Sequence, residues 1–445
     1  MHRTFAVYTL GCKVSQYESE AILEEAVRAG FTPVEDGADV AVINTCTVTA
    51  EGDRKCRQLV RRLRRQSPET KIMVCGCYSQ VSPEAVAAID GVAYVCGSEG
   101  KLRTVTRALE LLDGGEIPKI EITPLEGAGF EVMRITHAPR TRAYIKIEDG
   151  CDNRCAYCKI PDARGHVRSK KIADVVAEAR ALAAAGVREV VLTGIETASF
   201  GADTGENLCD LLDAVDGIDG IARIRLGSLE PTLMRPAFLD RIAKVKKLTP
   251  HFHLSMQSGS SRTLAAMRRK YNAEMALRNI EATRAALPGV QFTTDFIVGF
   301  PGETDADFAE TMEFARRVGF LATHVFKYSK RAGTPAAKMP NQVPEDVKHA
   351  RSQALIALSE ESTARCLAEI LEKDPVDTVL FEQKVGGLWS GHTAAFAEVR
   401  VASDADLHGE MRTVRLDAVE NDYIRGSLME ESAPQTAKIT EKCVQ

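Results

Sequence analysis

The sequence predicts an α/β protein with three parts: an N-terminal parallel-sheet α/β domain, a central partial (β/α)6 barrel and a small C-terminal antiparallel β-barrel. Strand-like and helix-like stretches alternate up to about residue 340, which is typical of parallel sheets with crossover helices. After about residue 375 the pattern changes to short alternating runs broken by glycine and aspartate, which indicates antiparallel strands. A chain of 445 residues is also too long for a single core.

The first predicted domain covers residues 1–140. Its first helix, at 15–29, carries apolar residues on one face and ends at a glycine. Apolar runs predict the strands of its parallel sheet at 4–9, 38–44, 71–74 and 92–95.

Cysteines follow three of these strands, at Cys12, Cys46 and Cys77. Because the carboxyl ends of parallel strands share one edge of a sheet, we expect these thiols to meet there as a three-cysteine cluster site. Each one alone is better explained as a small buried hydrophobe, and it is the occurrence of three at equivalent strand ends that favours a cluster. Cys75 competes with Cys77, and we choose Cys77 because it lies beyond the strand, after Gly76.

The second predicted domain, residues 141–340, holds the barrel. Helices are expected at 172–185 and, as one long stretch, at 261–287. The six strands are expected at 143–147, 189–192, 222–226, 251–255, 292–298 and 323–327. In such barrels the chemistry lies on the loops that follow the strands.

The loop after the first barrel strand reads CDNRCAYC and contains Cys151, Cys155 and Cys158. Three thiolates on one tight loop suit a cubic iron–sulfur cluster, one iron of which would keep an open position. The alternative is a zinc knuckle, which needs four closed ligands; the nearby candidate for the fourth is His166.

The other barrel loops supply candidates for binding. Glycine lets the backbone approach a ligand closely, although most such glycines only make turns. Arg164, Lys330 and Arg331 are low-ranked candidates for a substrate carboxylate or phosphate. The predicted cofactor-binding residues of these loops are Thr193, Gly194, Glu230, Gln257, Gly299 and Gly302.

The remaining chain is divided into a helical linker at 341–374, a β-barrel at 375–431 and a disordered tail at 432–445. The net charge is −5, so nucleic acid would have to bind local basic patches such as the helix EGDRKCRQLVRRLRRQ. The barrel arginines, Arg400, Arg412, Arg415 and Arg425, face either nucleic acid or solvent.

No run of eighteen apolar residues and no signal-like N-terminus occurs, so we expect a cytoplasmic protein without a membrane span. In that compartment twelve cysteines favour metal binding over disulfides.

The motifs TLGCKVSQYESEAI, NTCTVTAEGDRKCRQ, IKIEDGCDNRCAYCKIP, HLSMQSGS, TTDFIVGFPGET and HVFKYSKRAGTPAAKMPNQV occur in this order. Nearly the whole chain resembles the radical S-adenosylmethionine (SAM) tRNA methylthiotransferases, and within them the threonylcarbamoyladenosine (MtaB) type. The resemblance implies a methylthiotransferase domain, a radical SAM barrel and a TRAM-like RNA-binding barrel. It departs from the family pattern at Glu196, Phe200 and Lys327.

The resemblance implies two [4Fe-4S] clusters: an auxiliary one on Cys12, Cys46 and Cys77, and a SAM-binding one on the 151–158 loop, where Tyr157 is a further cofactor-binding candidate. The implied reaction adds a methylthio group to carbon 2 of N6-threonylcarbamoyladenosine at position 37, in the anticodon loop of tRNA. An electron donor such as flavodoxin or ferredoxin is implied, and no catalytic acid–base residue is named. The alternatives are a methylthiotransferase for isopentenyladenosine tRNA or for a ribosomal-protein aspartate. A non-enzymatic alternative is an iron–sulfur redox sensor that binds RNA.

Overall fold

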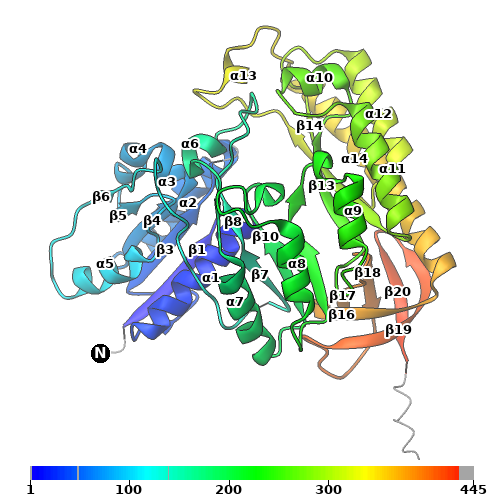
Figure 1. Cartoon of the computed structure of the whole chain (residues 1–445). Helices are drawn as coiled ribbons and strands as arrows, with labels where there is room; N and C mark the ends of the chain where they lie inside the picture. The colour runs from blue at the N-terminus through cyan, green and yellow to red at the C-terminus, as the bar shows by residue number, and fades with distance from the viewer. Residues whose placement is uncertain (1–2, 48–49, 139, 430–445) are drawn as a thin grey trace, which may run out of the picture. The chain divides into compact units, whose positions relative to one another are not determined.

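The computed structural model describes residues 3–47, 50–138 and 140–429. It divides into two compact units, Met1–Thr363 and Ala364–Gln445, and Figure 1 shows the course of the chain through them. The predicted disordered tail at 432–445 lies outside the described residues. The finer division at residues 140, 340 and 374 stays a prediction. No helix in the described part of the chain combines the length and apolarity that a membrane span requires.

The first unit begins with a six-stranded parallel sheet in the order β2-β1-β3-β4-β5-β6. Four predicted strands are found here within a few residues of their expected bounds, and β2 and β6 are short edge strands that the pattern did not indicate. The strands are β1 Thr4–Thr9, β2 Thr32–Pro33, β3 Val40–Thr45, β4 Lys71–Gly76, β5 Val92–Cys96 and β6 Ile120–Glu121.

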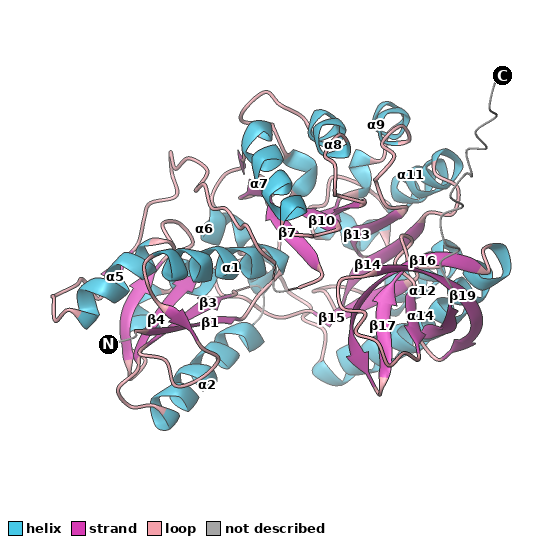
Figure 2. Cartoon of the chain, turned by 90° about the horizontal axis from the view of Figure 1, so that it is seen from below, coloured by secondary structure: helices cyan, strands magenta, loops and turns pink. Residues whose placement is uncertain are grey.

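Helices cover both faces of this sheet (Figure 2). Because side chains alternate along a strand, Val40 and Val42 of β3 face the core that contains α1 and α5, while Ala41 and Ile43 face α2, α3 and α4. The helices are α1 Lys13–Arg28, α2 Ala50–Gln66, α3 Cys77–Val81, α4 Pro83–Ala87 and α5 Arg103–Leu112.

The barrel follows in the same unit as two parallel sheets, β11-β10-β7 and β12-β13-β14-β15. All six predicted barrel strands are present, and β12 is an additional short one. The strands are β7 Arg142–Lys146, β10 Glu189–Thr193, β11 Arg223–Leu226, β12 Ser228–Leu229, β13 His251–Gln257, β14 Gln291–Val298 and β15 Ala322–Lys327, with a β8 Glu148–Asp149 and β9 Arg168–Ser169 hairpin beside them.

One predicted helix of the barrel, at 261–287, is wrong: the structure has α10 and α11 in its place. The chain breaks at Arg268, which has a positive φ of 61°. Asn272 then caps α11 by accepting a hydrogen bond from the Met275 N–H. The barrel helices are α6 Ile160–Arg164, α7 Ile172–Ala184, η1 Thr197–Ser199, α8 Leu208–Asp216, η2 Pro231–Leu233, α9 Pro236–Ile242, α10 Ser261–Ala266, α11 Ala273–Ala286, α12 Asp305–Val318 and α13 Pro335–Lys338.

Helix α1 packs against both the N-terminal sheet and the barrel. Tyr17 and Ala21 of α1 belong to the large hydrophobic cluster of the barrel, together with Ala143 and Ile145 of β7. The Tyr17 hydroxyl donates to the Met133 carbonyl at 2.6 Å. Helix α1 therefore fixes the carboxyl edge of the N-terminal sheet relative to the first barrel strand.

The second unit contains a closed five-stranded barrel in the order β16-β17-β18-β20-β19. Four of its strands were predicted, and β17, which reads LWSGH, was missed because two polar residues and a glycine hide its alternation. The β18–β20 pair is parallel, whereas the other pairs are antiparallel. The elements are α14 Glu345–Lys373, which crosses the boundary between the units, β16 Val376–Val385, β17 Leu388–His392, β18 Glu398–Val401, β19 Met411–Glu420 and β20 Tyr423–Leu428.

Candidate functional site

The structure brings the ends of strands β1, β3 and β4 together, where Cys12, Cys46 and Cys77 follow. Thr9 pairs with Asn44, and Thr45 pairs with Gly76, so the three strands end side by side. A Cβ built on Gly11 would lie 3.6 Å from the Cβ of Cys46. The charge of Cys12 acts on Cys77, which places these two thiols at the same edge as well.

Cys77 is held by a buried arginine of the barrel unit. Arg164, at the end of α6, donates from Nε to the Cys77 sulfur at 3.0 Å. Its Nη1 is 2.5 Å from Oε1 of Glu18 and 3.1 Å from Oδ2 of Asp149. Gly76 makes this approach possible, because its φ of 102° turns the chain and a Cβ there would lie 2.6 Å from the Asn44 side chain.

The arginine belongs to a buried ion network. Lys101 and Lys146 lie 2.8 and 3.1 Å from the Glu18 carboxylate, and Lys146 also lies 3.1 Å from Asp149. Burial alone would raise the pKa of Glu18, but Arg164, Lys101 and Lys146 hold it well below its ordinary value. Three cations thus surround two carboxylates and the Cys77 thiol, whose pKa is raised by burial and lowered in part by the nearby Arg164 and Lys101.

The other cysteines of the N-terminal sheet lie in its interior. Cys75 and Cys96 are fully buried in the core under α1 and α5, and Cys56 of α2 is buried in the opposite core. Burial raises the pKa of the Cys75 thiol well above its ordinary value, as expected of an inert buried thiol. Cys77 is buried as well, so the two cysteines differ mainly in position: Cys75 lies within β4 and Cys77 follows it, and the choice between them stays a prediction.

The loop with Cys151, Cys155 and Cys158 is fixed by a second buried arginine. Arg269, in the break between α10 and α11, donates from Nη1 to the Cys155 sulfur at 3.2 Å. The Ile160 N–H donates to the Cys158 sulfur at 3.4 Å. Arg269 also forms an ion pair with Glu230 at 2.8 Å, so it connects this cysteine loop to the loop after β12.

The spacing of the sulfur atoms favours a multi-iron cluster over a single metal ion. The ligands of one tetrahedral zinc lie about 3.8 Å apart, given a Zn–S bond of about 2.3 Å. Among the described residues, neither cysteine trio brings its three sulfur atoms within 4.8 Å of one another. His166, the fourth zinc ligand of the alternative, is exposed and hydrogen-bonded to Asp152 at 2.6 Å. Thiolate donors are the usual ligands of iron–sulfur clusters, and the assignment of one cluster to each trio stays a prediction.

A cavity of about 760 Å³ opens beside the 151–158 loop. Asn153 of that loop donates to Glu230 at 3.2 Å on the cavity wall. Burial, and then the charge of Glu230, raise the pKa of Glu196 to about 7. The wall combines these polar groups with Leu233, Phe238 and Met275, a mixture that suits a ligand with a charged end and a flat ring.

The predicted cofactor-binding residues have different positions. Glu230 lines this cavity, and the ring of Tyr157 packs edge-to-face on Phe300 at 6.4 Å between centroids. Thr193 is buried at the end of β10. Their role in binding SAM stays a prediction.

The predicted glycines shape the loops. Gly194 lies against the Glu148 side chain, whose Oε2 a Cβ there would approach to 2.5 Å. Gln257, Gly299 and Gly302 have φ values of 63°, 72° and 81°, and turn the chain where β13 and β14 end. The N–H of Gly299 is used by Glu303 and that of Gly302 by the Asn341 carbonyl.

The predicted substrate cations are also spread out. Arg164 is enclosed in the buried network, and Arg331 pairs with Asp53 at 2.8 Å and donates to Thr47, next to Cys46. Lys330 is exposed. Their binding of substrate stays a prediction, but the contacts of Arg164 and Arg331 position the auxiliary cysteines.

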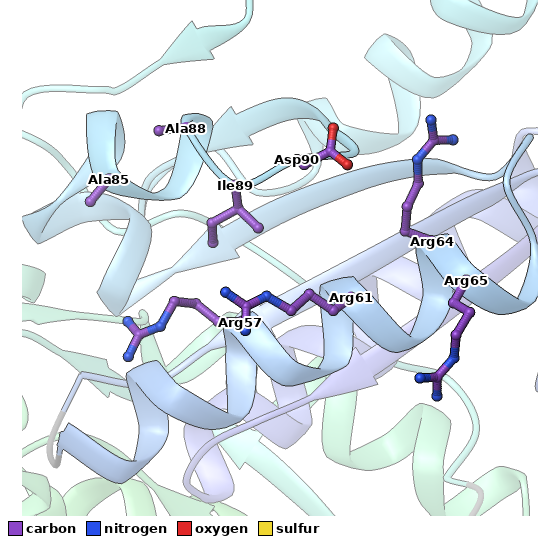
Figure 3. Close-up of a pocket in the computed structure, with 8 residues that line it drawn as sticks. All are labelled: Arg57, Arg61, Arg64, Arg65, Ala85, Ala88, Ile89 and Asp90. Carbon is purple, nitrogen blue, oxygen red and sulfur yellow. The ribbon is translucent and has the colours of Figure 1, made fainter.

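An arginine-lined groove lies on the other side of the N-terminal sheet, between α2 and the α4–β5 turn. It has a volume of about 430 Å³, and Figure 3 shows Arg57 and Arg61 of α2 side by side beneath Ile89. Arg57 donates to the Tyr78 hydroxyl at 3.2 Å, the residue after Cys77. The remaining lining residues are Arg64, Arg65, Ala85, Ala88 and Asp90.

The groove arginines differ from those of the C-terminal barrel in their partners. Among the described residues, Arg57, Arg61 and Arg65 form no ion pair with a carboxylate. In contrast, the barrel arginines pair with neighbouring acidic residues: Arg400 with Glu398, Arg412 with Glu410, Arg415 with Asp417 and Arg425 with Glu420. Of these two sets of arginines, the α2 set is therefore the stronger candidate for binding an external anion.

Two family models match the chain: "Uncharacterized protein family UPF0004" over residues 4–97 and "Radical SAM superfamily" over residues 145–315. The threonylcarbamoyladenosine tRNA methylthiotransferase MtaB of Bacillus subtilis is 38% identical over 442 residues, 96% of each chain. The MtaB of Thermotoga maritima is 34% identical over 97% of this chain and 99% of its own length. The chain belongs to the radical SAM tRNA methylthiotransferase family. It is therefore an enzyme with SAM and iron–sulfur cofactors, as predicted.

Other relatives of this methylthiotransferase are named for the alternative substrate, tRNA with dimethylallyladenosine, which is the isopentenyladenosine mentioned above. The tRNA-2-methylthio-N(6)-dimethylallyladenosine synthase of Carboxydothermus hydrogenoformans is 36% identical over 80% of this chain and 83% of its own length. Among solved structures, the radical SAM methyltransferase TsrM of Kitasatospora setae, with cobalamin and a [4Fe-4S] cluster bound, matches with a TM-score of 0.57. Its identity is 16%, over 88% of this chain and 81% of its own. At that identity the match shows a common fold.

Sequence reasoning missed three features of the site. Arg269 lies in the stretch predicted as one helix, and that assignment hid its role beside Cys155. The cavity residue Glu196 was noted only as a departure from the family pattern. The third feature is a cluster of His253, Asp295 and His324, whose ligand atoms lie within 4.8 Å of one another; the period-two spacing of HFH on β13 was the available signal.

Proposed function

We propose that this enzyme adds a methylthio group to carbon 2 of N6-threonylcarbamoyladenosine at position 37 of tRNA, in the cytoplasm. Its cofactors are SAM and two [4Fe-4S] clusters, held by Cys12, Cys46 and Cys77 and by the three cysteines of the 151–158 loop. The observation that carries the proposal is the presence of two three-cysteine sites in one compact unit. Helix α3, which begins at Cys77, packs against α6, which follows Cys158.

The chemistry of the target explains why two such sites are needed. The carbon 2 C–H of adenine has neither an acidic proton nor a leaving group, so no side chain can activate it by acid–base catalysis. The cysteines of the 151–158 loop would hold the cluster that binds SAM, and Cys12, Cys46 and Cys77 would hold the auxiliary cluster; when bound, these cofactors would supply the radical chemistry and the sulfur that side chains cannot. An electron donor such as flavodoxin or ferredoxin delivers the reducing equivalents.

The protein's own residues position these groups. The 760 Å³ cavity beside the 151–158 loop is lined by Asn153, Glu196 and Glu230. Carboxylates at this place suit the ammonium group and the ribose hydroxyls of SAM. Arg269 and Arg164 each donate a hydrogen bond to one cysteine sulfur. Such hydrogen bonds stabilise the anionic thiolate and tune a cluster's reduction potential.

The α2 groove supplies a surface for the anticodon arm. Its arginines lie on the helix that begins four residues after Cys46, and an RNA phosphate is the anion that unpaired guanidinium groups hold best. The base would then be extruded from the loop toward the cysteine sites. The TRAM-like barrel remains a second proposed RNA contact, although its arginines have acidic neighbours.

The alternatives differ in their substrates. The test is to incubate reduced, cluster-loaded enzyme with anticodon stem–loops that bear threonylcarbamoyladenosine or isopentenyladenosine, and to measure the added methylthio mass. The proposal expects addition to the first. Addition only to the second, or only to a ribosomal-protein aspartate, would contradict it. Failure of the reduced protein to cleave SAM would support the redox-sensor alternative.

A further inference from the structure

The inner face of the barrel is polar, as the positions of the core residues on β13 and β14 show. Phe252, Leu254 and Met256 of β13 belong to the hydrophobic cluster under the helices. The alternate residues of the same strand, among them His253, therefore point to the opposite, inner face. The same alternation places Asp295 of β14 on the inner face, since Phe296 and Val298 lie in the core.

The last three strands carry a compact polar cluster on this face. The Nε2 of His253 lies 3.2 Å from the Asp295 carboxylate, and its Nδ1 lies 2.9 Å from the Thr293 hydroxyl. Asp295 pairs in register with His324 of β15, and the His253 and His324 rings are 5.8 Å apart. His324 is exposed.

The first strands contribute cations. Arg225 of β11 donates from Nε to Glu189 of β10 at 2.9 Å, and the charge of Arg142 on β7 also acts on this carboxylate. These residues are fixed by strand pairing, because Glu189 lies opposite Arg142 and Arg223 in the two ladders.

Lys13 is close enough to be affected by charges from both groups, the polar cluster on β13–β15 and the charged residues on β7, β10 and β11. The charges that act on its ammonium include those of Arg142 and Arg225 from the first strands and that of Asp295 from the later ones; Lys13 in turn acts on His324. It is the first residue of α1 and follows Cys12 directly. Its side chain is open to solvent, and among the described residues its ammonium forms no hydrogen bond and no ion pair.

A lysine in this position has the properties of a ligand contact. It follows Cys12 at the start of α1, the helix that packs against barrel strand β7, and it lacks an acceptor within the described part of the protein. An ammonium that already lies near arginines gains most from an added carboxylate, because that anion relieves the repulsion between the cations and forms a charge-assisted hydrogen bond.

We propose that Lys13 binds the carboxylate of the threonylcarbamoyl group and thereby selects this substrate over isopentenyladenosine. The inference rests on the proposed function and replaces Lys327, Lys330 and Arg331 as the expected carboxylate contacts. Lys327 points away from the inner face and pairs with Glu345 of α14, and Arg331 is paired with Asp53. The apolar isopentenyl group offers no partner to an ammonium.

The test compares binding of two stem–loops to cluster-loaded enzyme without SAM: one with threonylcarbamoyladenosine and one with its carboxylate methyl ester. The wild type should prefer the acid. Lys13→Gln should weaken binding of the acid by about tenfold or more, the value of one charged hydrogen bond, and leave the ester unchanged. Lys13→Arg should restore the preference in part. Lys244→Gln, an exposed lysine elsewhere on the barrel, is the matched control, and iron content verifies that Cys12 still holds its cluster.

The outcomes separate this inference from the proposed function. If the wild type modifies the threonylcarbamoyl stem–loop while Lys13→Gln keeps the full preference for acid over ester, only the role of Lys13 is refuted. Loss of that preference in Lys330→Gln instead would assign the carboxylate to the sixth barrel loop. If the wild type modifies only isopentenyladenosine, the proposed substrate itself is refuted.

Discussion

Glu18→Gln is expected to be among the most destabilising single substitutions of a charged residue in this protein. The carboxylate is fully buried and is shared by Arg164, Lys101 and Lys146. Glutamine keeps the shape but removes the charge that three buried cations face. Removing one partner of a buried ion pair costs about 3–5 kcal/mol, because the remaining charges are left without compensation.

The expected change in melting temperature follows from the size of the unit. The first unit extends over Met1–Thr363, and unfolding entropy is about 2.1 cal/mol/K per residue. A loss of about 3–5 kcal/mol therefore lowers its melting temperature by about 4–7 °C. Scanning calorimetry of both cluster-free and cluster-loaded protein measures this shift, and the cluster-free value isolates the ion network from cofactor loss.

The control is Glu25→Gln on the same helix, where the carboxylate is 40% exposed and pairs with Arg28; such a pair is worth about 1 kcal/mol or less. The pH dependence gives a second check. Because the pKa of Glu18 is lowered in the folded state, its contribution is complete above its ordinary pKa and is lost as the pH falls through the folded value. The wild-type advantage should thus shrink in acid. A Glu18→Gln shift no larger than that of Glu25→Gln at pH 7 would refute the reasoning.

Three further predictions concern the site. Cys77→Ala should halve the iron content of reconstituted protein from about eight per chain, whereas Cys75→Ala should leave it unchanged; the reverse result in iron analysis would reassign the ligand. Arg61→Gln with Arg65→Gln should lower the slope of log affinity for tRNA against log salt by about 1.4–1.8, compared with Arg316→Gln, and an unchanged slope would remove α2 from the RNA surface. Since the pKa of Glu196 is raised to about 7, SAM affinity should strengthen between pH 6 and pH 8 as this carboxylate ionises; equilibrium binding should show a flat profile in Glu196→Gln, and a profile that keeps its slope would exclude Glu196.

The positions of the strands along the chain were predictable because they depend on local patterns, and the same patterns led to the cysteine sites, which stay a prediction. Runs such as TFAVYT and ADVAVIN are apolar enough to require burial on both faces, as parallel strands do. The carboxyl-edge rule then placed Cys12, Cys46 and Cys77 together without any distance information. The choice between Cys75 and Cys77 needed only the position of the strand end.

The side chains that position these cysteines were not predictable, because their contacts cross long stretches of chain. Arg164 and Cys77 are 87 residues apart, and Arg269 and Cys155 are 114 apart. No periodicity encodes such a pair, and a lone arginine in a sequence is usually a solvated one. Lys13 was likewise noted only as part of the motif TLGCKVSQYESEAI. The structure adds that it begins α1, the helix that packs against the barrel strand β7.

The ion network around Arg164 also constrains how this protein can be divided or recombined. Its members come from both sides of the predicted boundary at residue 140: Glu18 and Lys101 before it, and Lys146, Asp149 and Arg164 after it. A fragment that ends at this boundary would expose the Glu18 carboxylate and the Lys101 ammonium, which are fully buried in the complete protein. A chimaera with another family member would have to exchange all five residues as a set. A charge-changing substitution at one of these positions is therefore expected to need a matching substitution in the other half.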